Sequence, residues 1–444
     1  MNLKLLVGVV YIGLVAVSVC AQESRSARET MPAVSRASAA IAEQSKSQTL
    51  PGLSDLVAEA LKNNPEIQAA KGKIQSARAR AGQATYLEDP ELNMEAWGVP
   101  LNHPLRYRSA NPLIIGMRQK LPFFGKLGLK GEMATQEVRM AEEELRAKEQ
   151  EIVAKVKSAY ADYFMAGKGV EIYRELLDLI GHTTATAEGL YQVGRAPQQD
   201  IIKALLERTE LLNKLTWAEK DLFTSRAKLN TLLSRHPDSR LGEPRELDLT
   251  SIPTQFAHLE KLAMEERPEL RALESSIART ETAVQLAERN RKYPDFMVGL
   301  QYWVAPDQSP RHMYAPMLTL TIPFSPWTKG KHDYEIEEAL SERQAAKANL
   351  TAMKNMALFE VRDMFAKVEA AMKSINIYKD GLLPQAEQSF QAAVAAYQTG
   401  GVNFMTLLDS QRTIRDVRMG YYKALVDYEQ SRADLERAVG KELE

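Results

Sequence analysis

The chain has 444 residues, a formal net charge of −1 and 26% charged residues. Because a protein that binds nucleic acid normally shows a basic face, this balance gives no support for a nucleic-acid partner. A hydrophobic content of 45% is ordinary for a folded protein, and the length suffices for two or three domains.

Residues 1–21 are predicted to be a secretory signal peptide. Lys4 precedes an apolar run from Leu5 to Val19, which is too short for a membrane-spanning helix, and small residues follow. The mature protein is therefore expected to leave the cytoplasm. Residues 22–50 are rich in Ser, Ala, Arg and Gln and are predicted to form a poorly ordered tether.

Cys20 is the only cysteine, so the exported chain has no internal disulfide. Its position at the end of the signal leaves two interpretations open. Cleavage before Cys20 would produce a lipoprotein with acyl chains on this residue. Cleavage after Ala21 would remove Cys20 together with the signal.

Two copies of one plan follow, at residues 51–235 and 254–444, joined by a Pro- and charge-rich linker at 236–253. Four anchor motifs recur in the same order, and partners are 201 to 206 residues apart. This matching order and spacing indicate an internal duplication. The anchors are Pro65 and Pro268, Pro90 and Pro294, Pro122 and Pro323, and the turns Tyr191-Gln192-Val193-Gly194 and Tyr397-Gln398-Thr399-Gly400.

Each copy is predicted to run helix, strand, loop, strand, long helix, turn, helix. Alternating apolar and polar residues predict strands at about 91–98, 113–123, 295–305 and 314–324. The long helices carry apolar and small residues at intervals of three and four, as in coiled coils. From Gly125 to Tyr191 this pattern predicts a helix about 100 Å long, at ~1.5 Å per residue.

Four strands do not close a barrel, and a membrane-spanning β-structure must close because unpaired backbone groups in hydrocarbon are very costly. Strands of about ten residues have the length that crosses a bilayer. We therefore expect a barrel shared between chains, with apolar faces toward lipid and Glu91, Glu95, Arg118 and Lys120 toward a wet lumen. The alternative is a small soluble sheet with one face packed on helices.

Paired motifs in the two copies resemble the outer membrane factor family, the TolC-like exit ducts of Gram-negative efflux systems. They are NNPEIQAA and ERPELRAL, DPEL and YPDF, LPFFGK and IPFSPWTKGK, and YQVG and YQTG. The stretch LPFFGKLGLKGEMA is most similar to the heavy-metal, CusC/CzcC-like branch. The resemblance implies a mainly α fold with transmembrane β-structure. A homotrimer would form a 12-stranded outer-membrane β-barrel, four strands per chain, continued by a long α-helical periplasmic tunnel.

The resemblance also assigns roles at the two ends of the long helices. At the strand-to-helix junctions, Pro ends a strand, Gly lets the chain turn, and Lys places its ammonium group in water. At the opposite ends, the Tyr-Gln-x-Gly turns would form the periplasmic tip where an adaptor docks, since Gly accepts the left-handed conformation that ends a helix. The junction residues are Pro122, Gly125, Lys126, Pro323, Gly330 and Lys331, and the tip residues are Tyr191, Gly194, Tyr397 and Gly400.

In the family, acidic residues just after the second turn ring the closed mouth. Asp409 holds one such position, and Asp200 holds the first-copy position that matches Thr406. Thr406 and Val402 stand where a second acidic residue and a gating Arg occur, which puts the family's salt-bridged lock in doubt. The alternative for Asp200 is a solvated carboxylate that favours the helix dipole.

No phosphate loop, dinucleotide fingerprint or cluster of Cys and His predicts a cofactor or metal site. His103 and His312 fall in predicted outer loops, where lone histidines are usually solvated. The chain is therefore expected to be no enzyme, and the energy for transport would come from a partner.

The leading hypothesis is a passive exit duct in the outer membrane of a Gram-negative bacterium, surrounded by lipid, with its helices in the periplasm. The duct would act with a periplasmic adaptor and an inner-membrane RND-type pump, and heavy-metal cations are the favoured substrate. The alternatives are efflux of drugs or other organic compounds, type I protein secretion, and a purely structural periplasmic coiled coil.

Overall fold

A computed structural model describes residues 52–98, 101, 111–247, 249, 255–305 and 309–443. The predicted signal peptide, the tether at 22–50, Cys20 and His103 lie outside the described residues, as do parts of the linker at 236–253. The two repeated copies together form one compact unit.

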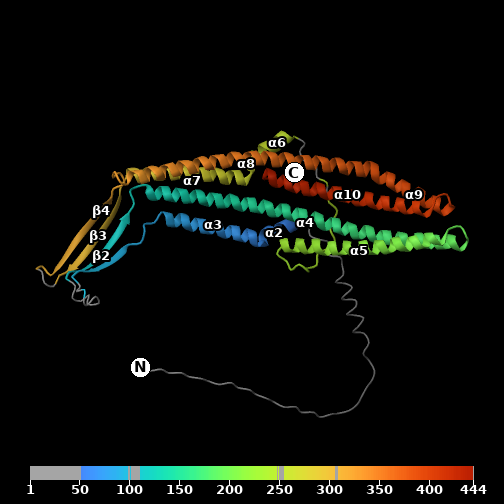
Figure 1. The fold of residues 1–444 in the computed structure, drawn as a ribbon, viewed down its shortest axis with the longest axis horizontal. Helices are drawn as coiled ribbons and strands as arrows, with labels where there is room; N and C mark the ends of the chain where they lie inside the picture. Colours follow the sequence, from blue (N-terminus) through green and yellow to red (C-terminus); the bar gives the residue numbers. More distant parts are fainter. Residues whose placement is uncertain are drawn as a thin grey trace, which may run out of the picture. The chain divides into compact units, whose positions relative to one another are not determined.

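The order of elements repeats along the chain (Figure 1). The first copy contains α2 (Leu53–Asn63), α3 (Pro65–Ala84), β1 (Glu91–Ala96), β2 (Leu113–Leu121), α4 (Lys126–Gln192) and α5 (Gln198–Leu232). The second contains α6 (Phe256–Glu266), α7 (Pro268–Lys292), β3 (Asp295–Val304), β4 (His312–Thr321), α8 (Lys329–Ile377), the π-helical turn η2 (Tyr378–Leu382), α9 (Leu383–Thr399) and α10 (Phe404–Val439).

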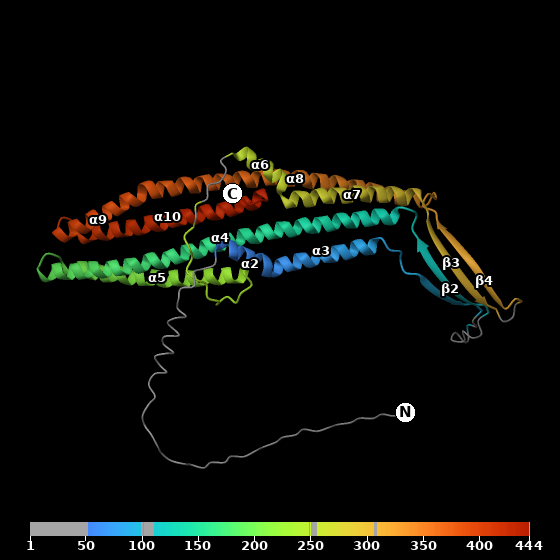
Figure 2. The ribbon, with the colours of Figure 1, turned by 180° about the vertical axis from the view of Figure 1, so that it is seen from behind.

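The strands form one antiparallel sheet in the order β1-β2-β3-β4 at one end of the helices (Figure 2). Apolar side chains of neighbouring strands lie opposite each other, as in the pairs Met94–Ile115 and Ile115–Tyr302. This apolar face is exposed: Leu92 is 77% and Met94 69% accessible. Strands β1 and β4 are the two edges of the sheet.

Helix α4 joins the two copies. It contacts α3 and α5 of its own copy and α7 and α10 of the second copy. Helices α3 and α5 follow one another along α4, and the side-chain amide of Asn64 donates to the carbonyl of Leu232 at 3.3 Å where they meet. Helices α7 and α10 follow one another along α8 in the same way. Among the described residues, no helix is both long and apolar enough to cross a membrane.

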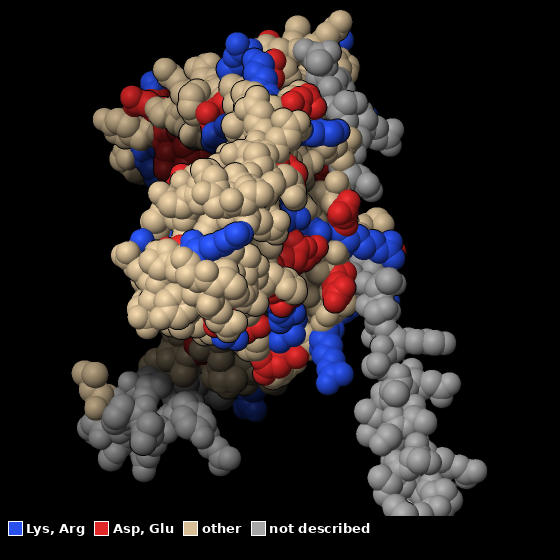
Figure 3. Space-filling view, turned by 90° about the vertical axis from the view of Figure 1, so that its right-hand side faces the viewer, with Lys and Arg blue, Asp and Glu red and all other residues tan. Residues whose placement is uncertain are grey.

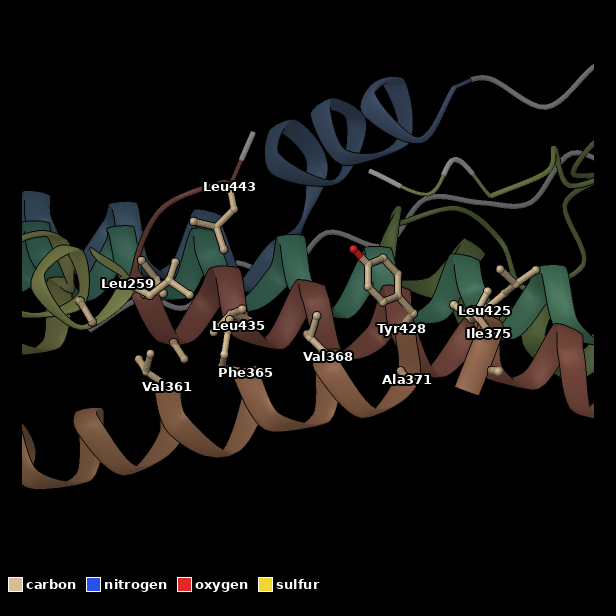
Figure 4. Packing of buried hydrophobic residues seen from close by; sticks show 14 residues of the cluster. Leu259, Val361, Phe365, Val368, Ala371, Ile375, Leu425, Tyr428, Leu435 and Leu443 are labelled. Carbon is tan, nitrogen blue, oxygen red and sulfur yellow. The ribbon is translucent and has the colours of Figure 1, made fainter. Parts of the chain in front are cut away.

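A large apolar cluster holds α6, α8 and α10 together (Figure 4). Val361, Phe365 and Val368 project from α8 toward Leu435 and Tyr428 of α10. These positions recur at intervals of three and four, which places them on one face of each helix. Complete burial of a Leu or Val side chain contributes roughly 1.5–3 kcal/mol.

The C-terminal ends of α5 and α10 differ between the two copies. Helix α10 ends at Gly440, whose φ of 85° is left-handed, and a Cβ there would lie 2.8 Å from the Cα of Arg267. The first copy places Ser234 at the matching position with a φ of 60°, and its hydroxyl donates to the carbonyl of Asn63 at 3.1 Å. Only the tighter contact in the second copy requires glycine.

Buried positions of α4 recur 205 residues later in α8, as Val156 and Val361 show. The spacing between Tyr191 and Tyr397 at the tips is 206 residues. The second copy therefore contains one extra residue, and the π-helical turn at Tyr378–Leu382 lies in the interval that contains it. A π turn adds one residue without interrupting the helix, so α8 continues into α9 through Pro384.

Candidate functional sites at the two ends of the helices

At the first strand-to-helix junction, Gly125 has a φ of 85° and precedes the first residue of α4. The guanidinium of Arg289 fills the space beside it and donates to the carbonyl of Phe124 at 3.0 Å. The ring of Phe123 stacks on Tyr293 with 4.4 Å between centroids. The turn is thus held by residues of the second copy, on α7 and just after it.

Lys126 corrects a prediction. Its ammonium was expected in water, but its side chain is only 5% exposed and lies 2.8 Å from a carboxylate oxygen of Asp295. The ammonium also donates to the carbonyl of Tyr293 at 3.0 Å, and the same Asp295 oxygen accepts the backbone N–H of Phe123 at 3.0 Å. A buried ammonium needs such partners because leaving water is costly for a charge. Lys126 therefore joins the two copies.

The second junction is built differently, and this also corrects a prediction. The turn is made by Ser325 and Thr328, whose hydroxyls are 2.5 Å apart, and α8 already begins at Lys329. Gly330 consequently lies inside the first turn of α8 rather than at the bend. Lys331 is 73% exposed and has Glu335 at 3.6 Å. Pro122 and Pro323 each directly follow the end of a strand or lie within two residues of it.

The two tips contain the expected left-handed glycines. Gly194 has a φ of 74° and Gly400 a φ of 81°, and no atom lies within 4 Å of a Cβ built at either. Their backbone N–H groups donate to the carbonyls of Tyr191 and Tyr397 at 2.9 and 3.1 Å. The tyrosines differ, however, because Tyr191 is half exposed whereas Tyr397 is buried against Phe404.

Asp200 on α5 and Tyr397 on α9 are close enough to affect each other's pKa. Burial raises the pKa of the Asp200 carboxyl above its ordinary value, although Lys203 and the Tyr397 hydroxyl oppose the rise. Burial and the neighbouring Asp200 charge raise the pKa of Tyr397 to about 12. The phenol is therefore neutral at physiological pH. Asp200 is half-buried in the single chain and lies beside the second hairpin.

A charged pair that the sequence analysis missed lies about two turns into α5 and α10. The carboxylate of Glu207 on α5 accepts hydrogen bonds from the guanidinium of Arg412 on α10, with a Nε–Oε2 distance of 3.0 Å. The Glu207 side chain is 4% exposed. A signal was available, since Glu207 interrupts the buried stripe formed by Ala204 and Leu211. A charge in an apolar stripe indicates a partner on the facing helix.

The remaining gate candidates do not form a lock within one chain. Asp409 is exposed on α10, and its charge acts on Arg412 together with Glu207 and Glu210. Thr406 completes the N-terminal cap of α10, where its N–H donates to the side chain of Asn403 at 2.9 Å.

Figure 3 looks onto the end of the molecule that carries the hairpin tips. Uncharged side chains dominate the two tips in the foreground, and charged side chains are more frequent behind them. Exposed apolar residues there are Tyr191, Val193 and Met405.

No group of three or more His, Cys, Asp and Glu residues that could hold a metal ion occurs in the part of the chain that the structure describes. His312 lies at the start of β4, where its Nδ1 is 2.9 Å from the Tyr302 hydroxyl. His332 faces Glu335 at 2.8 Å.

A four-stranded antiparallel sheet with an exposed apolar face, continued by long helical hairpins, defines one subunit of an outer-membrane channel. A family model described as outer membrane efflux protein matches residues 56–235 and 259–441. Because these segments cover most of the sequence, the chain belongs to the outer membrane efflux protein family.

Individual relatives agree with this assignment. The cobalt-zinc-cadmium resistance protein CzcC of Cupriavidus metallidurans is 23% identical over 382 residues, 85% of each chain. A crystal structure of CusC is similar with a TM-score of 0.75 and 20% identity, over 88% of this chain and 92% of that one. The MtrE outer membrane channel of Neisseria gonorrhoeae, solved in an open state, has a TM-score of 0.73 at 17% identity, over 88% and 90% of the two chains.

The predicted family and fold class are therefore confirmed. The chain is an outer-membrane efflux channel protein, with four strands and long helical hairpins, and not an enzyme. Membership in this family argues against the soluble-sheet and structural coiled-coil alternatives.

Proposed function

We propose that three copies of the chain form a passive exit duct for heavy-metal cations. The observation that carries the duct is the sheet itself. Its four strands leave β1 and β4 without a second neighbour, and its apolar face is exposed. In a bilayer, free edges are very costly, so several copies must close a common barrel. Three copies would give 12 strands.

The helices support the same assembly. Large apolar side chains remain exposed on α5 of the first copy and on α8 and η2 of the second copy. These surfaces lie away from the contact that α4 makes between the two copies. Soluble proteins rarely leave such surfaces uncovered, and a neighbouring copy would cover them. The exposed residues on α5 are Ile202, Leu205, Leu206, Leu212, Trp217 and Phe223, and those on α8 and η2 are Met356, Leu358, Phe359, Ile377 and Leu382.

In this proposal the barrel lies in the outer membrane of a Gram-negative bacterium and the helices extend into the periplasm. The tips around Gly194 and Gly400 dock a periplasmic adaptor, which links the duct to an inner-membrane RND-type pump. Asp200 and Asp409 line the closed mouth.

Metal cations are proposed as the substrate because the name of CzcC refers to cobalt, zinc and cadmium resistance and because the LPFFGK junction resembles the heavy-metal branch. A duct needs no resident metal site. Efflux of organic compounds and protein secretion are the alternatives.

The test combines mass, conductance and resistance. The detergent-purified protein should have the mass of a trimer and form small, steady channels in planar bilayers. A deletion strain should become sensitive to cobalt, zinc or cadmium and regain resistance from the wild-type gene. A monomeric, non-conducting protein would refute the duct. Sensitivity to organic compounds alone would refute the metal substrate.

A further inference from the structure

The buried core of the second copy is interrupted at one level of its helices. One apolar cluster holds α8 against α10 and has Ile375 as its last member on α8 (Figure 4). A second cluster joins α9 and α10 to the first copy and begins on α9 at Ala386. None of residues 376–385 between the clusters is buried, and neither is any of residues 415–423 on α10. Segments with few buried apolar contacts are those that open locally at the lowest free energy.

The helix that passes through this level is intrinsically weak there. The π-helical turn η2 contains Gly381, and Pro384 is the second residue of α9. Glycine disfavours a helix because its backbone is freer in the unfolded state, and proline has no N–H to donate. Kinks in helices arise mainly at π turns and prolines. Figure 1 shows the ribbon changing direction between α8 and α9.

On the facing helix, α10, the same level carries a second glycine. The ring of Tyr378 from η2 occupies the space beside Gly420, where a Cβ would lie 2.6 Å from its Cζ atom. The matching residues of the first copy are Tyr173, 205 residues earlier, and Lys214, 206 residues earlier. Only the second copy therefore combines the tyrosine with a glycine that lets its ring lie against the opposite backbone.

The first copy is not interrupted at this level. Helix α4 continues as one α-helix from Lys126 to Gln192. Its buried residues Ile172, Leu176 and Ile180 continue through the segment that matches η2. One hairpin of the chain is thus continuous, and the other has a weak level across both of its helices.

We propose that η2 and Gly420 form a hinge in the second hairpin. Residues 383–414, which include α9, the tip turn and the first turns of α10, tilt about this hinge against α8 and the first hairpin. The moving part carries Gly400 and Asp409. The hinge is a property of the single chain and goes beyond the proposed function, whereas its effect on the mouth of the duct rests on that function.

The contact between the moving part and the first hairpin is suited to a shift. Gln411 lies in the buried stripe of α10 between Leu408 and Ile414, and it is only 4% exposed. Neither polar atom of its side-chain amide has a hydrogen-bond partner among the described residues. A buried amide without partners destabilises the packed arrangement, and water would satisfy it when the contact opens.

Hydrogen exchange followed by mass spectrometry tests the hinge in the native detergent-purified protein. Amides at 376–385 and at 415–423 should exchange roughly tenfold faster, or more, than those at 172–180 of α4. All three segments lie at one level of the molecule, so α4 is an internal control. Equal protection of the three segments would overturn the hinge, including the case in which a neighbouring copy covers η2 and holds it rigid.

A stiffening variant tests whether the two sides of the hinge act together. Gly381→Ala with Pro384→Ala raises the helix propensity of η2 and α9, and a Cβ at Gly381 meets no atom within 4 Å. Exchange should slow at 376–385 and also at 415–423, although the substitutions lie on another helix. Slowing confined to the substituted segment would show a local change of propensity and would overturn the hinge.

Gly181→Ala is the matched control, since it adds a Cβ in α4 that also meets no atom within 4 Å. It should leave exchange at the hinge unchanged, and slowing equal to that of the stiffening variant would overturn the assignment. Gln411→Leu should slow exchange throughout α9 and the first turns of α10, because it removes the unsatisfied amide. Faster exchange in this variant would show that Gln411 stabilises the contact and would remove it from the proposal.

Conductance in planar bilayers separates the hinge from the duct. The stiffening variant should pass to its larger conductance levels less often than the wild type and Gly181→Ala. Slowed exchange with unchanged conductance would keep the hinge and overturn its effect on the mouth. A wild-type protein that exchanges as expected but does not conduct would overturn the duct and leave the hinge in place.

Discussion

The pair between Glu207 and Arg412 gives the sharpest stability prediction because its two members differ in burial. The Glu207 side chain is 4% exposed and that of Arg412 is 42% exposed. Arg412→Met leaves a buried carboxylate without its cation. Breaking a buried pair costs about 3–5 kcal/mol, and because water can reach the space that Arg412 vacates, we expect about 2–3 kcal/mol. Glu207→Gln leaves a half-exposed cation and an amide that still accepts a hydrogen bond, so we expect about 1 kcal/mol.

The double variant Glu207→Met with Arg412→Met should cost less than Arg412→Met alone, because two apolar side chains leave no buried charge. Hydrogen exchange of α5 and α10 amides in the detergent-solubilised protein measures the free energy of local opening directly. Arg418→Met is the matched control, since its pair with Glu175 is half exposed on both sides and should cost below about 1 kcal/mol. If Arg412→Met costs no more than Arg418→Met, burial of Glu207 does not govern the stability of the hairpin contact.

Three further predictions concern the helix ends and the tips. Gly440→Ala should lower the apparent melting temperature, because the left-handed backbone alone costs about 1–2 kcal/mol and the new Cβ would meet the backbone of Arg267. Gly72→Ala is the control. Its Cβ meets no atom within 4 Å inside α3, so this variant should be neutral or stabilising. The pKa of Asp200 is raised in the folded protein, so the contribution of this carboxyl to tip stability is fully present below about pH 4 and is lost as the pH rises through the raised value. Hydrogen exchange at the tip should show this trend, and Asp200→Asn should abolish it. Gly400→Pro should abolish adaptor binding in a pull-down, because proline cannot adopt the φ of 81°.

Each of these three predictions has an outcome that would contradict it. Equal melting temperatures for Gly440→Ala and Gly72→Ala would mean that the backbone contact at the end of α10 is loose. A tip that becomes less stable in acid, or an unchanged pH profile in Asp200→Asn, would show that another group titrates there. Normal adaptor binding by a folded Gly400→Pro trimer would place the docking surface elsewhere.

The sequence predicted the elements well because their signals are local. Alternation located all four strands, and the unbroken pattern from Gly125 to Tyr191 located α4 to within one residue. The surroundings of single side chains were harder to predict. Lys126 was expected in water because its partner Asp295 lies 169 residues away, on the other copy. Gly330 was expected at a bend because the motif Gly-Lys recurs, although the second copy carries four additional residues between Pro323 and Lys331 that move the turn to Ser325 and Thr328.

The duplication explains why such errors arise at equivalent positions of the two copies. Equivalent positions face the same problem but solve it with different chemistry. Where α3 follows α5, the buried position before Pro65 is Asn64, whose amide caps backbone groups. Where α7 follows α10, the buried position before Pro268 is Arg267, which pairs with Glu360 at 2.6 Å.

The same divergence continues one helix away. Asn230 in α5 donates to the carbonyls of Pro237 and Ser239, whereas the matching Glu436 in α10 binds Lys157 at 2.6 Å. The repeat therefore indicates where a polar group is buried, but it does not identify the partner of that group. Asn230 is satisfied by carbonyls seven and nine residues away, whereas Glu436 requires a lysine 279 residues away on α4. A partner so distant in the sequence can be found only from the packing of the two copies.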